Sequence, residues 1–410
     1  MTPAARLQMA IEVLEGLEKT GQPTDRFLKA WFRTRRFAGS KDRRAIAEHV
    51  FTAQRRRAGF AHRMGSATPR ALMIAALLDS GDDVSALFTG GYGPAPLSDA
   101  ERAAIAAPPR PAPRWVRGEY PQWLDKELLR AFGDGLDVEM AAFLPRAPTD
   151  LRVNTLKASR DEVIAALELE AAPTPFAPHG IRIPGEAGNL SQSALFESGA
   201  FEFQDEAAQL AAALLAVRPG MRVLDLAAGA GGKSLALAAA MENRGEIVAC
   251  DVRGEALFEL QKRAVRAGAT IIRTLLLEEG PNPHLPDGVF DAVLVDAPCS
   301  GTGTWRRQPE LRWRLTPGRL AELTAIQDGL LDRAAALLAP GGVLLYATCS
   351  ILPVENQDRV EAFLSRHPGF VPVELADALP VPVPGLGRDF RASPALTGTD
   401  GFFCAGLKRA

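Results

Sequence analysis

Two cysteines in the C-terminal half of the chain each follow a run of β-type residues. Cys299 stands in DAPCSGTG (296–303) and Cys349 in YATCS (346–350). Because the carboxyl ends of parallel strands meet at one edge of a sheet, two thiols in these places would converge on one mouth. A single cysteine is commonly a small buried hydrophobe, but two thiols beside the carboxylate of Asp296 favour catalysis. The spacing therefore predicts thiol chemistry at a strand-end site.

A glycine-rich turn precedes the cysteines along the chain. VLDLAAGAGGKS (223–234) has the pattern of a strand, a turn and a helix start, and glycine there lets the backbone approach a ligand. Alone, such a turn could bind NAD, a phosphate or S-adenosylmethionine, or could be only a tight turn. The spacing from Gly229 to Lys233 is too short for a phosphate loop. Asp251 ends the next predicted strand, about 20 residues beyond, where its carboxylate could accept bonds from ribose hydroxyls. Turn and acid together favour nucleoside binding.

The elements that must position these residues follow from the pattern of apolar residues. From residue 221 onward, β-rich runs such as MRVLDLA and FDAVLVDA alternate with helical segments. This alternation predicts an α/β fold with a Rossmann-like, doubly wound and mainly parallel sheet of seven strands, in a domain over 201–410. The runs 370–375 and 401–408 would be its last two strands, one of them antiparallel.

Three further segments precede that domain. Apolar residues at helical spacing predict an all-helical domain over 1–90. Glycine and proline gather over 91–115, which predicts a linker. Residues 116–200 resume helical spacing and then alternate as strands do, which predicts a helical connection followed by a small α+β module. We expect this module to bind RNA.

Composition supports a globular protein with several domains. The chain has 410 residues, of which 47% are hydrophobic and 23% charged, and its net charge is −2, so wholesale disorder is excluded. Residues 25–70 hold thirteen Lys and Arg against three Asp and Glu, a net charge of +10. Such a block suggests contact with a polyanion, although a solvated helix face is the commoner explanation of a charge run.

Targeting and redox features point to the cytoplasm. The amino terminus carries charges throughout, unlike a signal peptide, and no uncharged apolar run reaches membrane-spanning length. The four cysteines form neither a disulfide framework nor a zinc-site spacing, so we predict no metal site. We expect a cytoplasmic protein without membrane contact, and no obligate protein partner is evident.

At this point the chain resembles the Nop/Sun (RsmB-like) family of S-adenosylmethionine-dependent RNA cytosine-5 methyltransferases. The resemblance runs from about Leu151 to the C terminus, and the paired DAPC and TCS motifs are its most specific part. The other shared motifs are RVNTLK (152–157), FQDEAAQL (203–210), the glycine turn, Asp251, ENQ (355–357) and TDGFF (399–403). The resemblance implies a class I methyltransferase sheet, with residues 1–90 as a basic, NusB-like RNA-binding domain.

The resemblance also implies roles for single residues. Cys349 would add to carbon 6 of cytosine, Cys299 would remove the carbon-5 proton, and Asp296 would stabilise charge at nitrogen 3. Lys233 would favour the Cys349 thiolate. The expected cofactor-binding residues are Ala227, Ala228, Gly229, Ala230, Gly231, Gly232, Lys233, Asp251, Glu279 and Asp296. Ala230 stands where the family usually has proline, and Glu279 where an aspartate is expected near the adenine.

The target cytosine must leave its stack to meet two thiols, which favours single-stranded or loop RNA. Aromatic and basic residues interleave just after Cys299, in TWRRQPELRWR (304–314), as in a stacking and phosphate-binding loop. The expected RNA contacts are Arg152, Asn154, Lys157, Arg306 and Arg307.

Three alternatives remain at the level of sequence. A DNA cytosine methyltransferase would use a Pro-Cys thiol as nucleophile, whereas this chain has a Thr-Cys thiol as well. A non-catalytic RNA-binding assembly factor would not need intact thiols, glycines and Asp251. Ribosomal RNA is the expected substrate, with transfer RNA as the alternative.

Overall fold

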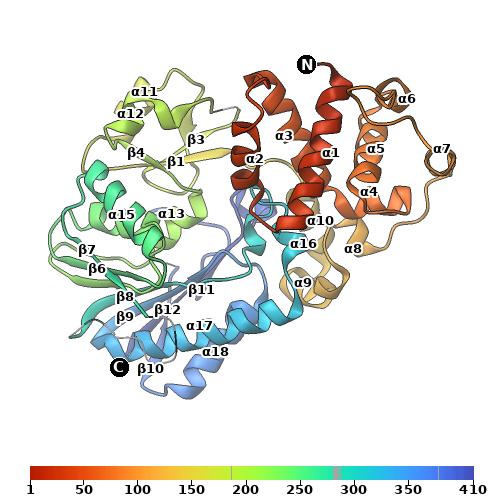
Figure 1. Ribbon diagram of the computed structural model, residues 1–410. Helices are drawn as coiled ribbons and strands as arrows, with labels where there is room; N and C mark the ends of the chain where they lie inside the picture. Colours follow the sequence, from red (N-terminus) through yellow and green to blue (C-terminus); the bar gives the residue numbers. More distant parts are fainter. Residues whose placement is uncertain (186, 279, 281–285, 287, 377) are drawn as a thin grey trace. The chain divides into compact units, whose positions relative to one another are not determined.

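The structure is a computed structural model that describes residues 1–410 except 186, 279, 281–285, 287 and 377. The chain divides into two compact units. The helical unit comprises Met1–Pro145 and Trp305–Leu315, and the α/β unit comprises Arg146–Thr304 and Thr316–Ala410. Each unit is described by itself below, and Figure 1 labels their elements.

Capping residues in the sequence begin several helices of the helical unit. The hydroxyls of Thr2 and Thr68 each accept a backbone N–H, with proline at the first helical position, and Ser98 and Glu101 form a capping box. The helices are α1 (Pro3–Thr20), α2 (Thr24–Arg33), α3 (Ser40–Arg55), α4 (Arg57–Met64), α5 (Pro69–Ser80), α6 (Val84–Leu87), α7 (Asp99–Ala106), α8 (Arg114–Arg117), α9 (Asp125–Phe132), α10 (Leu136–Ala142) and α16 (Leu311–Arg314). Thus α7 and the first two residues of α8 lie inside 91–115, for which the sequence predicted a linker.

Apolar faces of α1 to α5 form the core of the helical unit. Leu7, Ile11, Ile46, Val50 and Ile74 are among its buried residues. Their spacing of three or four residues along each helix is the pattern that predicted helices here.

The segment Trp305–Leu315 belongs to the helical unit although the sequence assigned it to the domain over 201–410. Arg312 is completely buried, and its guanidinium donates to the carbonyl oxygens of Arg55, Glu119 and Phe143 at 3.4, 3.1 and 3.0 Å. The buried Trp305 ring packs edge-on against Phe143 with 5.7 Å between centroids. These partners lie far away along the chain, so no local sequence pattern could predict these contacts.

A small antiparallel sheet opens the α/β unit. Its order is β2 (Ala172–Pro173), β3 (Gly180–Ile183), β1 (Thr149–Val153) and β4 (Phe201–Phe203). The helices α11 (Arg160–Ala166) and α12 (Ala194–Glu197) accompany it, and Val163 of α11 is buried with Leu151, Ile181 and Phe201. This module confirms the α+β pattern expected before residue 200.

The large sheet of the α/β unit confirms the Rossmann-like, doubly wound fold (Figure 1). In the described residues it has eight strands and not the expected seven, because a further short strand pairs with the last one. Its order is β10 (Phe370–Val373), β12 (Phe402–Arg409), β9 (Leu338–Thr348), β8 (Phe290–Asp296), β5 (Arg222–Asp225), β6 (Glu246–Asp251) and β7 (Ile272–Leu276), and β11 (Asp389–Ala392) pairs with β12. The five strands from β9 to β7 are parallel, whereas β12 runs antiparallel to β9, β10 and β11.

Alternate residues of the central strands face opposite sides of the sheet. Val223 packs in one apolar cluster and its neighbour Leu224 in the other, as the two-residue period of a strand requires. The accompanying helices are α13 (Glu206–Ala213), α14 (Gly232–Ala240), α15 (Gly254–Ala267), α17 (Pro317–Leu337), α18 (Gln357–Arg366) and α19 (Pro394–Thr397). Burial on both faces explains why these strands are continuous apolar runs. None of the helices in the described part of the chain is both long and apolar enough to cross a membrane.

Candidate active site

The two predicted thiols meet at the carboxyl ends of neighbouring strands. β8 and β9 pair in parallel, with Asp296 opposite Ala347, so the loops after them carry Cys299 and Cys349 to the same edge. Both cysteines are half-buried and free, and 3.3 Å separates their sulfur atoms. The hydrogen bond with Cys349 and burial together raise the pKa of Cys299 well above its usual range. Cys299 is therefore a neutral thiol at neutral pH in the resting protein.

A buried carboxylate holds the two cysteine loops together. Glu355 has no exposed surface, and its oxygens accept hydrogen bonds from the backbone N–H and hydroxyl of Ser300, from the hydroxyl of Ser350 and from the amide of Gln327. Each serine directly follows a cysteine, so the carboxylate ties the loop of Cys299 to that of Cys349. The sequence offered the motif ENQ (355–357) but no physical reason to assign this role.

The amide of Asn356 completes the support of the Cys349 loop. Its oxygen accepts from the hydroxyl of Thr348 at 2.6 Å, and its nitrogen donates to the carbonyl of Ser350 at 2.9 Å. The carbonyl of Cys349 itself accepts from the backbone N–H of Gly303 at 2.9 Å. Residues on both sides of the Cys349 thiol are thus fixed, which pre-positions the sulfur.

Lys233 and Asp296 form an ion pair in the same unit. The Lys233 ammonium lies 2.5 Å from a carboxylate oxygen of Asp296, and the lysine is buried at the first turn of α14. Burial alone lowers the pKa of Lys233, but attraction to Asp296 outweighs it and the net shift is upward. Lys233 is therefore a cation, and it also interacts electrostatically with Cys349.

The glycine turn between β5 and α14 is shaped for close approach of a ligand. Gly229 and Gly231 have φ values of 55° and 80°, which favour glycine. A Cβ atom on Gly231 would stand 2.4 Å from the Leu260 side chain. The turn ends at the amino terminus of α14, whose N–H groups suit an anionic group such as a carboxylate.

Asp251 lies at the end of β6, beside the turn. Its carboxylate accepts from the backbone N–H of Gly229 at 2.8 Å, and from the backbone and guanidinium of Arg253 at 2.8 to 3.1 Å. Burial raises the pKa of Asp251, but these donors outweigh it and the net shift is downward. Asp251 is thus an anion, and a ribose that binds it must displace the mostly exposed Arg253 side chain.

One buried acid escaped the sequence analysis. Asp225 ends β5 and accepts a hydrogen bond from the hydroxyl of Ser234 at 2.6 Å. Burial, and then the nearby negative charge of Asp296, raise the pKa of Asp225 to about 7. Its position at the last residue of the strand before the glycine turn was the signal that could have identified it.

The structure corrects the expected RNA contacts in the small module. Arg152 is buried and donates to Gln204 and to the carbonyl of Gly232, and burial lowers its pKa to about 10. Asn154 is also buried, and its amide donates to two backbone carbonyls. These two side chains hold the α/β unit together because their polar groups are used internally. Lys157 is exposed, and its contact with RNA stays a prediction.

The RNA contacts expected after the Cys299 motif are also affected by burial. Arg306 is buried and Arg307 half-buried within the helical unit. Arg306 therefore does not present its side chain to a ligand as expected, because the segment that carries it is packed into that unit. Glu279 lies outside the described residues.

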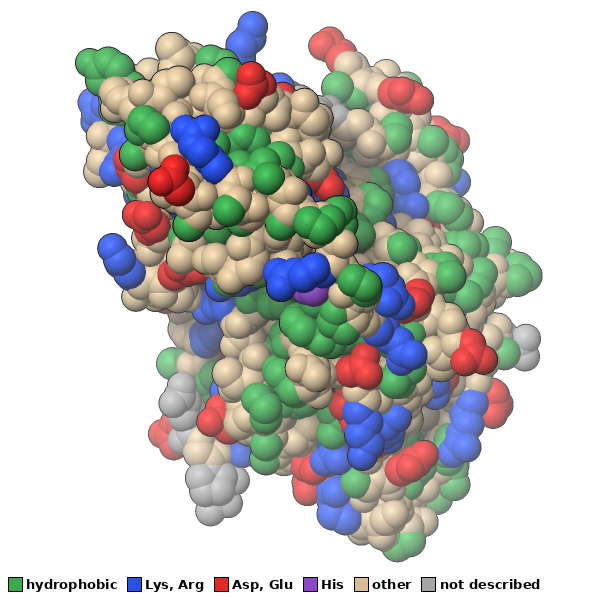
Figure 2. All heavy atoms as spheres, turned by 90° about the vertical axis from the view of Figure 1, so that its right-hand side faces the viewer, with side chains coloured by type: hydrophobic (Ala, Val, Ile, Leu, Met, Phe, Trp, Pro, Cys, Tyr) green, Lys and Arg blue, Asp and Glu red, His purple; other side chains and the backbone are tan. Residues whose placement is uncertain are grey.

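The basic block over 25–70 is less basic in space than along the sequence. Arg56, Arg57 and Arg70 each form an ion pair with an acidic side chain from elsewhere in the helical unit. Figure 2 shows one face of the molecule, on which some Lys and Arg side chains lie beside Asp and Glu and others form a basic group next to a histidine. The net charge counted over residues 25–70 therefore overstates the positive potential that a polyanion would meet.

Known proteins resemble this chain in sequence and in fold. A family model described as 16S rRNA methyltransferase RsmB/F matches residues 212–408, and one described as the ferredoxin-like domain of the RsmF/B-like methyltransferases matches 120–188. The probable ribosomal RNA small subunit methyltransferase B of Synechocystis is 35% identical over 300 residues, which cover 71% of this chain and 67% of that protein. Its namesake from Thermus thermophilus is 36% identical over 308 residues, or 73% and 68%.

A solved structure has a similar fold over the whole chain. The crystal structure of PH0851 superimposes with a TM-score of 0.79 and 28% identity, covering 100% of this chain and 99% of that one. The fold and the family are those of S-adenosylmethionine-dependent RNA methyltransferases. The chain belongs to the RsmB/F family of rRNA methyltransferases, and the resemblance that the cysteine motifs indicated is confirmed.

Proposed function

We propose that this protein transfers a methyl group from S-adenosylmethionine to carbon 5 of a cytosine in rRNA, with Cys349 as nucleophile and Cys299 as its partner. The observation that carries the proposal is the pair of free thiols 3.3 Å apart at adjacent strand ends. The relatives named above are rRNA small subunit methyltransferases, which favours rRNA over tRNA. Because its substrate would be rRNA, we propose that the protein acts in the cytoplasm.

The residues around the glycine turn fit the cofactor. The left-handed glycines, the amino terminus of α14 and the carboxylate of Asp251 offer a cradle, an anion site and a ribose acceptor. Ala227 to Lys233 would hold the methionine end and Asp251 the ribose. When bound, the cofactor supplies an electrophilic methyl group.

Cys349 would begin the cycle by adding to the ring. Carbon 5 of cytosine is a weak nucleophile until a thiolate forms a bond to carbon 6, which pushes electrons toward carbon 5. Asp296, paired with Lys233, would contact the edge of the cytosine ring at which charge develops. Lys233 would favour the Cys349 thiolate before the addition.

The thiol pair suggests when Cys299 becomes a base. The hydrogen bond with Cys349 is the largest cause of the raised pKa of Cys299. Once the Cys349 sulfur is bonded to carbon 6, it is no longer an anionic acceptor, and this cause disappears. Cys299 would then release its proton to solvent, and its thiolate would take the carbon-5 proton after methyl transfer. The Cys349–carbon bond would break as the ring double bond re-forms, which returns Cys349 as a thiolate. The geometry thus suits an ordered cycle of addition, transfer and elimination.

Two single substitutions test this assignment. Cys349→Ala should abolish methylation and form no covalent complex, because no thiolate can reach carbon 6. Cys299→Ala should still add and transfer but stall before elimination, leaving enzyme joined to methylated RNA. Denaturing electrophoresis with radioactive S-adenosylmethionine would show this complex as a slowly migrating band. Cys404→Ala, which removes a buried thiol of β12, is the matched control and should methylate normally.

The substrate is tested in the same assay with 16S rRNA, tRNA and DNA of matched sequence. Methylation of rRNA at carbon 5 of cytosine, found by mapping the modified nucleotide, is the expected result. A band formed by Cys349→Ala and not by Cys299→Ala would exchange the two roles. Absence of methyl transfer to every nucleic acid, by protein that binds the cofactor, would favour a non-catalytic assembly factor.

A further inference from the structure

The helical unit contains a hollow flanked by two tryptophans. The hollow has a volume of about 420 Å³, and its larger lining residues are Trp115, Trp313, Arg57, His62 and Arg110. The rest of the lining consists of small residues of α4 and the turn after it: Ala58, Ala61, Gly65, Ser66 and Ala67. This size is typical of sites for small ligands, roughly 300–1,000 Å³. All of these residues belong to the helical unit, and none of them is acidic.

The two tryptophans are placed as stacking surfaces. Both are half-buried rather than enclosed. The indole N–H of Trp313 donates to the carbonyl oxygen of Gln54 at 2.8 Å, which fixes the ring. Trp115 lies in the short helix α8. A rigid aromatic face open to solvent is the feature on which unpaired bases stack in proteins that bind single strands.

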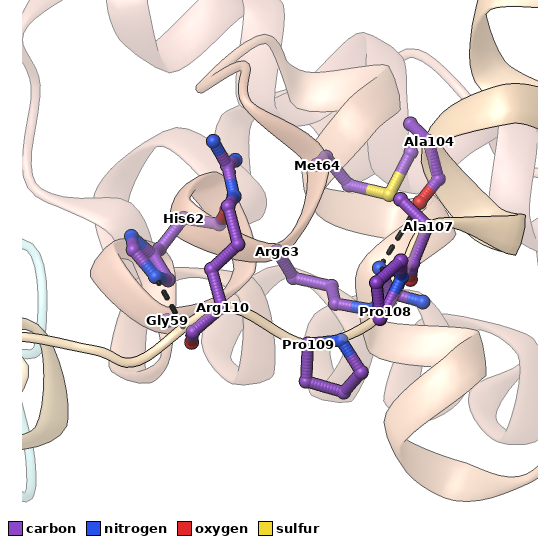
Figure 3. A pocket seen from close by; sticks show the side chains of 9 residues that line it. All are labelled: Gly59, His62, Arg63, Met64, Ala104, Ala107, Pro108, Pro109 and Arg110. Carbon is purple, nitrogen blue, oxygen red and sulfur yellow. Dashed lines mark hydrogen bonds between the residues drawn. The ribbon is translucent and has the colours of Figure 1, made fainter.

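A second hollow continues the first through two shared residues. It has a volume of about 260 Å³ and shares His62 and Arg110 with the tryptophan-flanked hollow. Figure 3 shows Arg63 extending to the end of α7, where it donates to three backbone carbonyls, whereas Arg110 extends away from Pro109. Within the described part of the chain, the guanidinium of Arg110 donates to the carbonyl of His62 at 3.1 Å. A guanidinium has five N–H donors, so others of Arg110 can bind a ligand.

Acidic residues limit this surface in the other direction. A third hollow, across Trp313 and Arg57, is lined by the carboxylates of Glu18 and Glu310. The Glu18 carboxylate pairs with Arg57 at 3.2 Å on the exposed surface, and such a pair contributes little and can be exchanged. A polyanion would therefore extend from Trp313 toward Arg110 and not toward Glu310.

We propose that the first two hollows, here named the tryptophan groove, bind a single-stranded segment of the RNA substrate. Bases would stack on Trp115 and Trp313, and phosphates would bind Arg110 and Arg57. This inference rests on the proposed RNA substrate, and it assigns recognition to a groove rather than to the basic block as a whole. Trp313 comes from the segment that follows the Cys299 motif, so the groove needs the full chain.

The test uses the full chain and a short fluorescein-labelled single-stranded RNA, with a duplex of the same sequence for comparison. Trp115→Ala should weaken binding of the single strand roughly tenfold, because stacking on one base is lost. Arg110→Ala should lower the slope of log affinity against log salt by about 0.7, the value for one phosphate on a single strand. The matched controls are Trp123→Ala and Arg36→Ala, which remove exposed side chains of the helical unit outside the hollows.

The binding and methylation results together test whether the tryptophan groove binds RNA. The proposal is supported if the groove variants lose affinity for the single-stranded RNA and the control variants do not. The groove variants should then also have a raised KM for RNA and an unchanged kcat. Equal losses for Arg36→Ala and Arg110→Ala would mean diffuse binding by the basic block and would overturn it, as would stronger binding of the duplex. If the wild-type protein methylates RNA and the groove variants bind RNA as well as it does, the proposed RNA-binding groove is refuted and the proposed function is not. If RNA binding depends on the groove but the protein transfers no methyl group, the proposed function is refuted and the groove is not.

Discussion

The helical unit and the α/β unit both bury charged side chains, but with different consequences. In the α/β unit the Glu355 carboxylate accepts hydrogen bonds from groups beside the two cysteines. In the helical unit the Arg312 guanidinium donates to carbonyls of three segments that lie far apart in sequence. Buried polar groups are kept where their bonds specify one arrangement. In one unit that arrangement is a pair of thiols, and in the other it is the attachment of Trp305–Leu315 to the helices.

The hydrogen bonds within the helical unit change the expected effect of removing the N-terminal helices. Along the sequence, the helical N-terminal region looks separable from the cofactor site. In the structure, α2 and α3 supply partners for Glu310, Arg312 and Trp313. A chain that starts near Ser98 would lack the partners of Glu310 and Trp313 and one of the three carbonyls that Arg312 binds. We therefore expect it to lose stability and not only RNA affinity.

The largest expected effect is on the attachment of the segment to the helical unit. Arg312→Ala removes three charge-assisted hydrogen bonds to backbone carbonyls from a fully buried position, so the free energy of unfolding should fall by about 3 kcal/mol or more. Urea unfolding of the full chain measures it. Arg314→Ala, two residues away and exposed, is the control and should change stability by less than about 0.5 kcal/mol. Equal, small effects of the two substitutions would show that Arg312 does not anchor the segment.

The next effect concerns the positions of the thiols. Glu355→Gln keeps the size of the side chain but replaces one acceptor by a donor facing two serine hydroxyls, so the two loops should shift. Because a displacement of about 1 Å can cost about 100-fold in rate, we expect kcat to fall by roughly that factor while KM for RNA stays near its wild-type value. Single-turnover methyl transfer measures it, with exposed Glu361→Gln as control. A normal kcat would mean that the thiols are positioned without this carboxylate.

The smallest effect is expected at the cofactor turn. Arg253 occupies positions on the Asp251 carboxylate that a ribose would need. Arg253→Ala should therefore tighten cofactor binding by about threefold, whereas Asp251→Ala should weaken it about tenfold or more, since hydrogen bonds to a carboxylate contribute about 1.5–3 kcal/mol each. Calorimetric titration with S-adenosylmethionine gives both values. Weaker binding by Arg253→Ala would instead make this arginine part of the cofactor site.

The sequence alone determined the main features of the α/β unit. The alternation of strands and helices, the glycine turn and the motifs around Cys299 and Cys349 are local patterns, each contained within about twenty residues. Because strands of a parallel sheet share one edge for their carboxyl ends, placing a cysteine after a strand was enough to predict that the thiols converge.

The tertiary structure decided everything that depends on residues far apart in the chain. The 3.3 Å between the two sulfurs, the ion pair of Lys233 with Asp296 and the role of Glu355 each require a register between strands or loops. The same holds for Arg152, whose basic character suggested RNA but whose guanidinium is buried. A side chain's type states what it can bond, whereas only packing determines whether solvent, a ligand or the protein itself supplies the partner.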